Sequence, residues 1–206
     1  IGLRSVFPLP LAFGAVAIAV LFVASHLWSR PANPLQSVSM TLFGIAYPTL
    51  MLTYLVDIRS GAEAAVGPSG AFWLTLTVFV LVWVSDTAAY YVGRAFGRRK
   101  LAPTISPNKT WEGSAAGGVA AIAAAVGLGM TALPFLPPAH CIAVGIICGV
   151  VGQLGDLAES RIKREVGVKD SGTILPGHGG ILDRFDALTI AAPLTYFYLF
   201  YVAGVL

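Results

Sequence analysis

Long apolar runs dominate this chain, and its polar residues gather in the stretches between them. Six runs are long enough to cross about 30 Å of hydrocarbon, which takes roughly 20 helical residues. The runs cover about residues 9–28, 38–56, 71–93, 113–133, 139–157 and 187–206. The pattern predicts an all-α, polytopic membrane protein with about six transmembrane helices, forming one helical domain over residues 1–206.

Composition supports this interpretation, because 56% of the residues are hydrophobic and only 11% are charged. These fractions are typical of polytopic membrane proteins rather than soluble domains. The first run is full-length and lacks a small-residue cleavage pattern, so we expect no removable signal peptide. Since the chain begins with Ile1 rather than Met, we expect an upstream piece to be missing.

The basic residues are distributed unevenly among the loops. If six helices alternate across the membrane, every Lys and Arg except Arg4 and Arg59 lies on one side. Loops rich in Lys and Arg face the cytoplasm in most membrane proteins. We therefore expect two loops, residues 94–112 and 158–186, to lie together on the cytoplasmic face and to form the active site.

The second of these loops has the highest density of charge. Residues 160–186 contain five Lys or Arg and four Asp or Glu. Charges of both signs beside a membrane are costly unless they bind a ligand or one another. A polyanion held with the help of a metal ion is therefore the first hypothesis for this loop.

Asp156 closes the fifth apolar run. If the helix continues into the loop, Ser160 and Lys163 share a face with Asp156, and Glu159 and Arg164 lie near the same stripe. A carboxylate beside a row of cations suits a divalent ion together with phosphate oxygens. The alternative is a salt-bridged helix end, in which Asp156 pairs with Lys163 or with a cation from a neighbouring helix.

A second cluster lies in the sequence HGGILDRFD at residues 178–186. Asp183 and Asp186 share a helix face if the sixth helix begins near residue 181, and Arg184 stands beside them. The glycines let the backbone approach a ligand, and amides at a helix start attract anions. His178 is a candidate phosphate ligand, acid or base, or only a capping residue.

Asp86 lies in the last third of the third run, where an ionisable residue suggests function. The alternative is a surface carboxylate paired with Arg94 or another base. Asp156 and Asp183 lie at the ends of adjacent runs with several cations around them. This arrangement suits metal-assisted phosphoryl or nucleotidyl transfer, although it does not name the substrate.

Two motifs resemble the phosphatidate cytidylyltransferases, also called CDP-diacylglycerol synthases. The first is S-x-x-K-R-x-x-x-x-K-D-x-x-x-x-x-P-G-H-G-G-x-x-D-R-x-D at residues 160–186, and the second is SDTAAYYVGRAFGRRKLAPTISPNKTWEG at residues 85–113. The chain departs from the family at its front, because members usually have additional N-terminal hydrophobic segments. It therefore looks truncated or naturally short.

The resemblance implies a nucleotidyltransferase of phospholipid biosynthesis, which converts CTP and phosphatidate into CDP-diacylglycerol and pyrophosphate. It implies a homodimer in a bacterial cytoplasmic membrane, with Mg²⁺ on Asp156 and Asp183 and room for a second, monovalent cation such as K⁺. Lys163 and Arg184 join these two aspartates as expected catalytic residues. The expected substrate-binding residues are Lys109, Ser160, Arg164, Lys169, His178, Asp86 and Asp186.

Three alternatives remain. A CTP-dependent polyprenol or phytol kinase would transfer the γ-phosphate, and a CDP-archaeol synthase would act on an ether lipid. An ion-coupled transporter would favour charges near the midplane and repeated halves, whereas these carboxylates cluster at helix ends. The basic residues are mixed with acidic ones beside the membrane, so nucleic-acid binding is not indicated.

Overall fold

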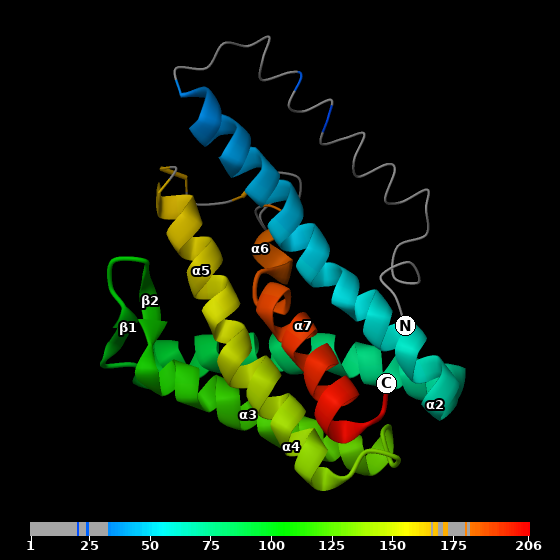
Figure 1. Cartoon of the computed structure of the whole chain (residues 1–206). Coiled ribbons are helices and arrows are strands. Elements are labelled where there is room, and N and C mark those ends of the chain that lie inside the picture. Colours follow the sequence, from blue (N-terminus) through cyan, green and yellow to red (C-terminus); the bar gives the residue numbers. More distant parts are fainter. Residues whose placement is uncertain are drawn as a thin grey trace. The chain divides into compact units, whose positions relative to one another are not determined.

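Figure 1 shows the computed structural model of the chain, which describes residues 20, 24, 33–165, 167–168, 171–172, 180 and 182–206. Almost all residues of the first predicted helix, residues 9–28, lie outside the described part. The candidate site residues Lys169 and His178 also lie outside the described residues. The chain divides into two compact units, Ile1–Leu50 and Met51–Leu206, and the candidate site lies in the second.

The described residues are mainly helical, which confirms the all-α class. The elements in chain order are α2 (Pro34–Phe96), β1 (Lys100–Ala102), β2 (Ser106–Thr110), α3 (Trp111–Thr131), α4 (Pro138–Ile146), the π-helix η2 (Ile147–Val151), α5 (Gly152–Glu165), α6 (Leu182–Phe185), α7 (Leu188–Tyr198) and the π-helix η3 (Leu199–Ala203). Helices α4, η2 and α5 follow one another directly, as do α7 and η3.

We expected a loop between the second and third apolar runs. In the structure this stretch is helical, with a single break. Both runs lie in α2, whose backbone leaves the helical region at Gly67, with φ 73° and ψ 171°. Glycine adopts a positive φ without steric cost, and the following Pro68 excludes the helical conformation from the residue before it. A one-residue break therefore replaces the predicted turn.

Four helical stretches in the described part are long and apolar enough to cross a membrane: Leu35–Phe96, Trp111–Thr131, Pro138–Glu165 and Leu182–Ala203. The expected count of about six is therefore not matched. One predicted helix lies outside the described residues, and two others are merged in α2. The last three predicted helices each have a counterpart.

The loop at residues 94–112 contains a small antiparallel sheet that the all-α prediction lacked. Strands β1 and β2 pair with Lys100 opposite Thr110 and Ala102 opposite Ser106. The turn between them is closed by the backbone N–H of Ile105, which donates to the carbonyl oxygen of Ala102 at 3.1 Å. The proline-containing loop is thus a hairpin that leads directly into α3.

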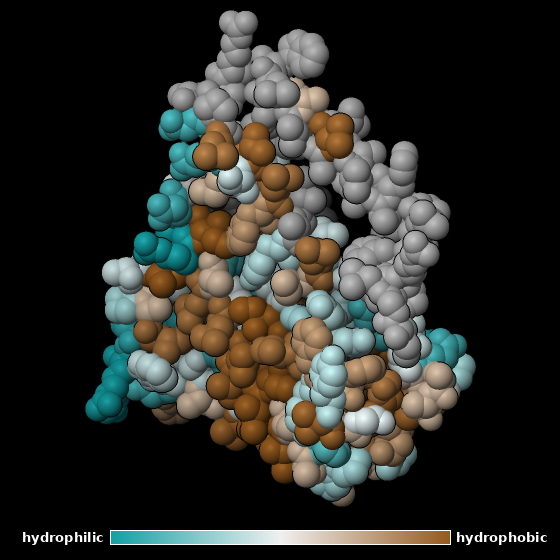
Figure 2. Space-filling view, in the orientation of Figure 1, coloured by the Kyte–Doolittle hydropathy of each residue, from teal (hydrophilic) through white to brown (hydrophobic). Residues whose placement is uncertain are grey.

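Small residues let α3 pack closely against α4 and η2, which lie beside it. A Cβ at Gly145 would lie 2.8 Å from the backbone Cα of Ile122, and one at Gly118 would lie 2.9 Å from Val150. Helices in lipid associate through such small-residue contacts. Figure 2 shows apolar surface over these helices, whereas hydrophilic residues gather near the end of α5 and the hairpin.

Candidate active site

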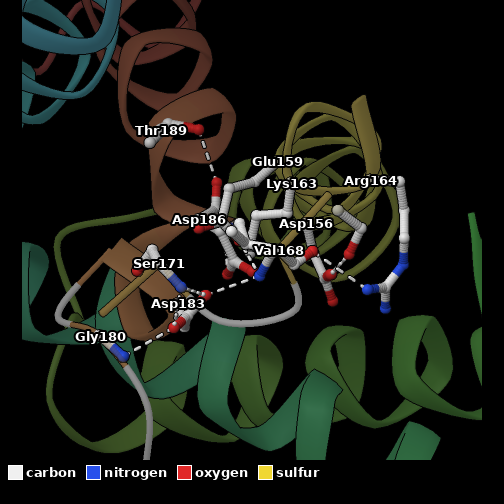
Figure 3. A network of polar contacts seen from close by, with 12 residues as sticks. Asp156, Glu159, Lys163, Arg164, Val168, Ser171, Gly180, Asp183, Asp186 and Thr189 are labelled. Carbon is white, nitrogen blue, oxygen red and sulfur yellow. Dashed lines mark hydrogen bonds and ion pairs between the residues drawn. The ribbon is translucent and has the colours of Figure 1, made fainter. Parts of the chain in front are cut away.

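Both loops expected to carry the site contact α5. Figure 3 shows the polar network that joins α5 to residues of the second loop. Lys109 of β2 forms an ion pair with Asp156 of α5. Near the end of the same helix, Arg164 donates from Nε to the backbone oxygen of Ile105 at 3.4 Å. These two contacts join the hairpin to the helix that leads into the second loop.

Local structure directs Lys109 toward α5. Its neighbour Thr110 ends β2 and caps α3, its side-chain oxygen accepting a backbone N–H of the first turn. The carboxylate of Glu112 accepts the backbone N–H groups of Arg98 and Arg99 at 3.2 and 3.3 Å. Because a cap satisfies donors that a helix start leaves without partners, these bonds fix the hairpin on α3.

Helix α5 continues past residue 157, as the shared face of Asp156 and Ser160 requires. The hydroxyl of Ser160 donates to Oδ1 of Asp156 at 3.2 Å, while Oδ2 pairs with Lys109. The ion-pair alternative is therefore realised for Asp156, but with a strand residue rather than with Lys163. The cation that neutralises Asp156 is Lys109, which comes from the loop at residues 94–112.

Lys163 lies between two carboxylates from different helices. Its Nζ is 2.8 Å from Oε2 of Glu159, one turn earlier in α5, and 2.6 Å from Oδ1 of Asp183 in α6. The Lys163, Glu159 and Asp183 side chains are only 14%, 3% and 11% exposed. Lys163 thus links α5 to α6 with little access for water.

Asp183 also closes the loop that precedes it. Its carboxylate accepts the backbone N–H of Gly180 at 2.7 Å and that of Ser171 at 3.0 Å. These two amides lie at opposite ends of residues 171–180, so one carboxylate holds both ends. A Cβ at Gly180 would lie 2.7 Å from the backbone nitrogen of Gly172, which explains why glycine is needed there.

Two further carboxylates face this region. Asp86 of α2 interacts electrostatically with Asp156 and Lys109, and Asp186 interacts with Asp156, Glu159 and Asp86. Asp186 follows α6, and its Oδ1 accepts the N–H of Ala187 at 2.7 Å. The carboxylate cluster is defined here by five residues: Asp86, Asp156, Glu159, Asp183 and Asp186.

A buried polar node ties three helical segments together next to the cluster. The π-helix carbonyl of Gly149 accepts from Ser85 of α2 at 3.1 Å and from the amide of Gln153. Gln153 also donates to the backbone oxygen of Ser114 in α3 at 3.1 Å and accepts the hydroxyl of that residue. Ser85 adjoins Asp86 and Gln153 precedes Asp156 by three residues, so the node fixes the backbones that carry both aspartates.

Sequence reasoning missed Glu159 and Gln153 as candidate residues. A signal existed for Glu159, because it precedes Lys163 by four residues, the spacing that favours a helical ion pair. Gln153 is an amide inside an apolar run, which could have marked it as a buried polar contact. Of the predicted residues, Arg164 is used in the hairpin contact and Arg184 is exposed on α6.

The donor atoms of the cluster suit a cation, but its side chains are not arranged around one. Three of its five carboxylates, those of Asp156, Glu159 and Asp183, are ion-paired with Lys109 or Lys163. Oε1 of Glu159 is buried with no hydrogen-bond donor among the described residues. Carboxylate oxygens are the donors that Mg²⁺ prefers. Within the described residues, however, no three acidic, histidine or cysteine side chains gather closely enough to hold a metal.

Comparison with known proteins matches residues 3–202 to the Cytidylyltransferase family. The chain is 48% identical over 201 aligned residues to the phosphatidate cytidylyltransferase of Haemophilus influenzae, covering 89% of this chain and 65% of the relative. It is 50% identical over 120 residues to the Bacillus subtilis protein of that name, covering 58% and 45%.

The Staphylococcus epidermidis protein of that name is 38% identical over 181 residues, covering 88% of this chain and 66% of the relative. The matched part of the chain thus spans between 45% and 66% of the length of these three curated relatives. The family match itself covers nearly the whole chain.

Proposed function

The chain belongs to the cytidylyltransferase family, and from this premise we propose that it transfers a cytidylyl group from CTP to phosphatidate. The products are CDP-diacylglycerol and pyrophosphate. The relatives named as phosphatidate cytidylyltransferases support this substrate pair. Apolar helices beside a charged cluster also suit a reaction between a soluble nucleotide and a lipid headgroup.

One observation carries the proposal: Lys109 and Lys163 come from different loops, and each is held by carboxylates of one cluster. Ammonium groups bind phosphate oxygens, and carboxylates bind the hard cations that accompany nucleotide triphosphates. A cluster that contains both can take up a triphosphate together with its cation. A helix end stabilised only by salt bridges would not need residues from both loops.

In the proposed reaction, a phosphate oxygen of phosphatidate attacks the α-phosphorus of CTP in line. A new bond forms between that oxygen and the α-phosphorus, and the bond from the α-phosphorus to the bridging oxygen breaks. Pyrophosphate leaves with the electron pair. Since the lipid phosphate is already ionised at neutral pH, no general base is needed, and His178 is not given that role.

The lysines and arginines bind phosphate in this proposal. Lys109 and Lys163 donate to triphosphate oxygens, and Arg164 and Arg184 contribute from the exposed side of α5 and α6. Lys169 and His178 lie outside the described part and keep the substrate-binding roles expected from the sequence. Ser160 orients Asp156 through its hydrogen bond.

We further propose that Mg²⁺ is held by Asp156 and Asp183, with Asp86 and Asp186 as neighbouring carboxylates and room for a monovalent cation such as K⁺. The excess of carboxylates over their lysine partners supports a cation here, as does the oxygen of Glu159 that has no donor among the described residues. When bound, such an ion neutralises phosphate charge and orients the triphosphate. A cytoplasmic-facing site and a homodimer complete the proposal.

The test uses purified protein with labelled CTP and phosphatidate in vesicles, with and without Mg²⁺. Asp156→Asn and Asp183→Asn should each lower turnover by about 100-fold or more, because a group that stabilises developing charge contributes about that much. Label should enter the lipid phase for the wild type only. Near wild-type turnover by either variant at saturating Mg²⁺ would remove that residue from the proposal.

The same assay separates the alternatives. A lipid kinase would release labelled CDP and give an unlabelled lipid phosphate when the label is in the cytidine. A CDP-archaeol synthase would prefer an ether lipid over the ester-linked phosphatidate. Ion flux across vesicles without CTP consumption would favour a transporter.

A further inference from the structure

We propose that Glu159 is a positioning residue that fixes the ammonium group of Lys163 for contact with the triphosphate. The inference rests on the proposed function for its substrate. It adds a residue that neither the motif analysis nor the comparisons assign. Glu159 acts through Lys163 rather than by touching the nucleotide.

Glu159 is one of the most completely buried charged residues in the described part of the chain. Its residue surface is only 2% exposed, and Oε2 lies 2.8 Å from Nζ of Lys163. Ionised carboxylates are rarely buried unless they are paired, because desolvation costs several kcal/mol. Lys163 is the partner that makes this burial tolerable.

The geometry leaves Lys163 with capacity for one more acceptor. A lysine ammonium carries three N–H donors and no acceptor. Two of these donors are directed to Glu159 and to Asp183, at 2.8 and 2.6 Å. Held from two helices, the ammonium group cannot move far. Within the described residues its third donor meets no further acceptor, so it can bond a phosphate oxygen.

A second pair on the same helix shows that such burial is not needed for helix stability. Arg161 and Glu165 have the same four-residue spacing, are 3.8 Å apart, and have side chains 62% and 66% exposed. A surface pair of this kind contributes little to stability. The Glu159–Lys163 pair differs in being buried and in reaching a carboxylate of another helix.

The other oxygen of Glu159 makes a purely structural role less suitable. Oε1 is buried without a hydrogen-bond donor among the described residues, and the side chain of Asp186, a second acid, lies within hydrogen-bonding reach of the same carboxylate. A carboxylate retained only for stability would have both oxygens satisfied. The carboxylate of Glu159 instead keeps a negative charge beside Lys163, and this charge orients the ammonium group.

The experiment combines Glu159→Gln, Lys163→Met and the double variant in the full chain. Wild type and the three variants are assayed for kcat and for KM of CTP with phosphatidate vesicles, and their Tm values are measured. Glutamine keeps the shape of glutamate and removes the charge, so this variant does not leave a buried charge unpaired. Glu165→Gln is the matched control on the same helix.

We expect Glu159→Gln to lower kcat about tenfold, since a charge-assisted hydrogen bond is roughly twice as strong as a neutral one. KM for CTP should change by less than about threefold, because binding interactions shared by ground and transition states are retained. In the Lys163→Met background, Glu159→Gln should have no further effect on kcat. The Glu165→Gln control should match wild type.

An equal kcat loss in both backgrounds, or no loss in either, would overturn the positioning role. The Tm values give a readout that does not depend on the reaction. Lys163→Met should lower Tm by about 6 °C or more, because it removes the cation shared by Glu159 and Asp183. Adding Glu159→Gln should restore the part of that loss that comes from Glu159, while Asp183 keeps its bonds to the backbone N–H groups of Ser171 and Gly180.

Failure of the proposed function is distinguishable from failure of this inference. If wild type does not turn over CTP and phosphatidate, the reaction assignment fails, and the Tm cycle alone decides whether Glu159 holds Lys163. Restoration of Tm in the double variant supports that contact. Additive Tm losses overturn it.

Discussion

Two closely packed regions of the second unit are built from opposite kinds of residue. The glycine seam, where α3 meets α4 and η2, consists of Gly118, Ala121, Ala125, Gly145 and Gly149. It brings backbones together with almost no side chain between them. The carboxylate cluster instead holds charged side chains that are costly to bury and are balanced by lysines.

The difference separates the residues that hold the helices from those proposed to act on a ligand. Small residues in the seam stabilise the helix packing, because they let the backbones come into van der Waals contact. The cluster gains little from packing, and its order depends on pairing across helices. The polar node joins the two regions, because the carbonyl of Gly149 in the seam accepts from Ser85 and Gln153, which flank the aspartates.

The largest expected effect follows from filling the seam. In Gly145→Leu, the new side chain would meet the backbone of Ile122, since even a Cβ would lie 2.8 Å from its Cα. Leucine favours the helix more than glycine does, so any loss of stability would come from steric overlap. We expect at least about 3 kcal/mol of destabilisation, seen as a Tm lower by about 6 °C or more and loss of activity with the fold.

Gly127→Ala is the matched control for the seam. Gly127 lies in α3, and a Cβ there would meet nothing within 4 Å. Alanine should leave Tm unchanged or raise it slightly, because it favours helix over glycine. If Gly145→Leu were as stable as this control, close backbone packing would not be what holds α3 to α4.

Sequence alone predicted much of this organisation. The apolar runs located the long helices, and the charge density of residues 160–186 marked one of the two stretches that form the candidate site. The continuation of the helix past residue 157 and the shared face of Asp156 and Ser160 were also predictable from the 3.6-residue period. These features depend on residues that are near one another in the chain.

The remaining features depend on partners far apart in sequence. Periodicity cannot choose Lys109 over Lys163 as the partner of Asp156, because that choice is set by how the hairpin is fixed on α3. Nor does hydropathy distinguish a turn from a break at Gly67, where the residues on both sides remain helical. The hairpin was missed because its strands are only three and five residues long.

An intermediate effect is expected from Gln153→Leu, which removes the centre of the polar node. The change leaves the partly buried hydroxyl of Ser114 without its amide acceptor and takes one donor from Gly149. We expect a loss of about 2 kcal/mol, a Tm lower by about 4–8 °C, and kcat lower by about tenfold. Reduced Tm with wild-type kcat would show that the node stabilises helices without aligning the aspartates.

The smallest effect should come from Ser85→Ala. Ser85 is almost fully buried, and its hydroxyl donates to Gly149 at 3.1 Å, but Gln153 donates to the same carbonyl oxygen. Because the acceptor keeps one partner, we expect about 1 kcal/mol of destabilisation, a Tm lower by about 2–4 °C, and less than threefold change in kcat. Thermal unfolding and steady-state turnover of the purified variant measure both quantities.

Ser60→Ala makes the same chemical change elsewhere on α2. The hydroxyl of Ser60 bonds locally to the carbonyl of Val56 at 2.9 Å and is exposed, so its removal should leave Tm and kcat close to wild type. If Ser85→Ala lowered kcat as strongly as Gln153→Leu, alignment of Asp86 would depend on the direct contact between α2 and η2. In that case Gln153 would serve mainly to hold α3 and η2 together, and the seam and the cluster would be joined through Ser85.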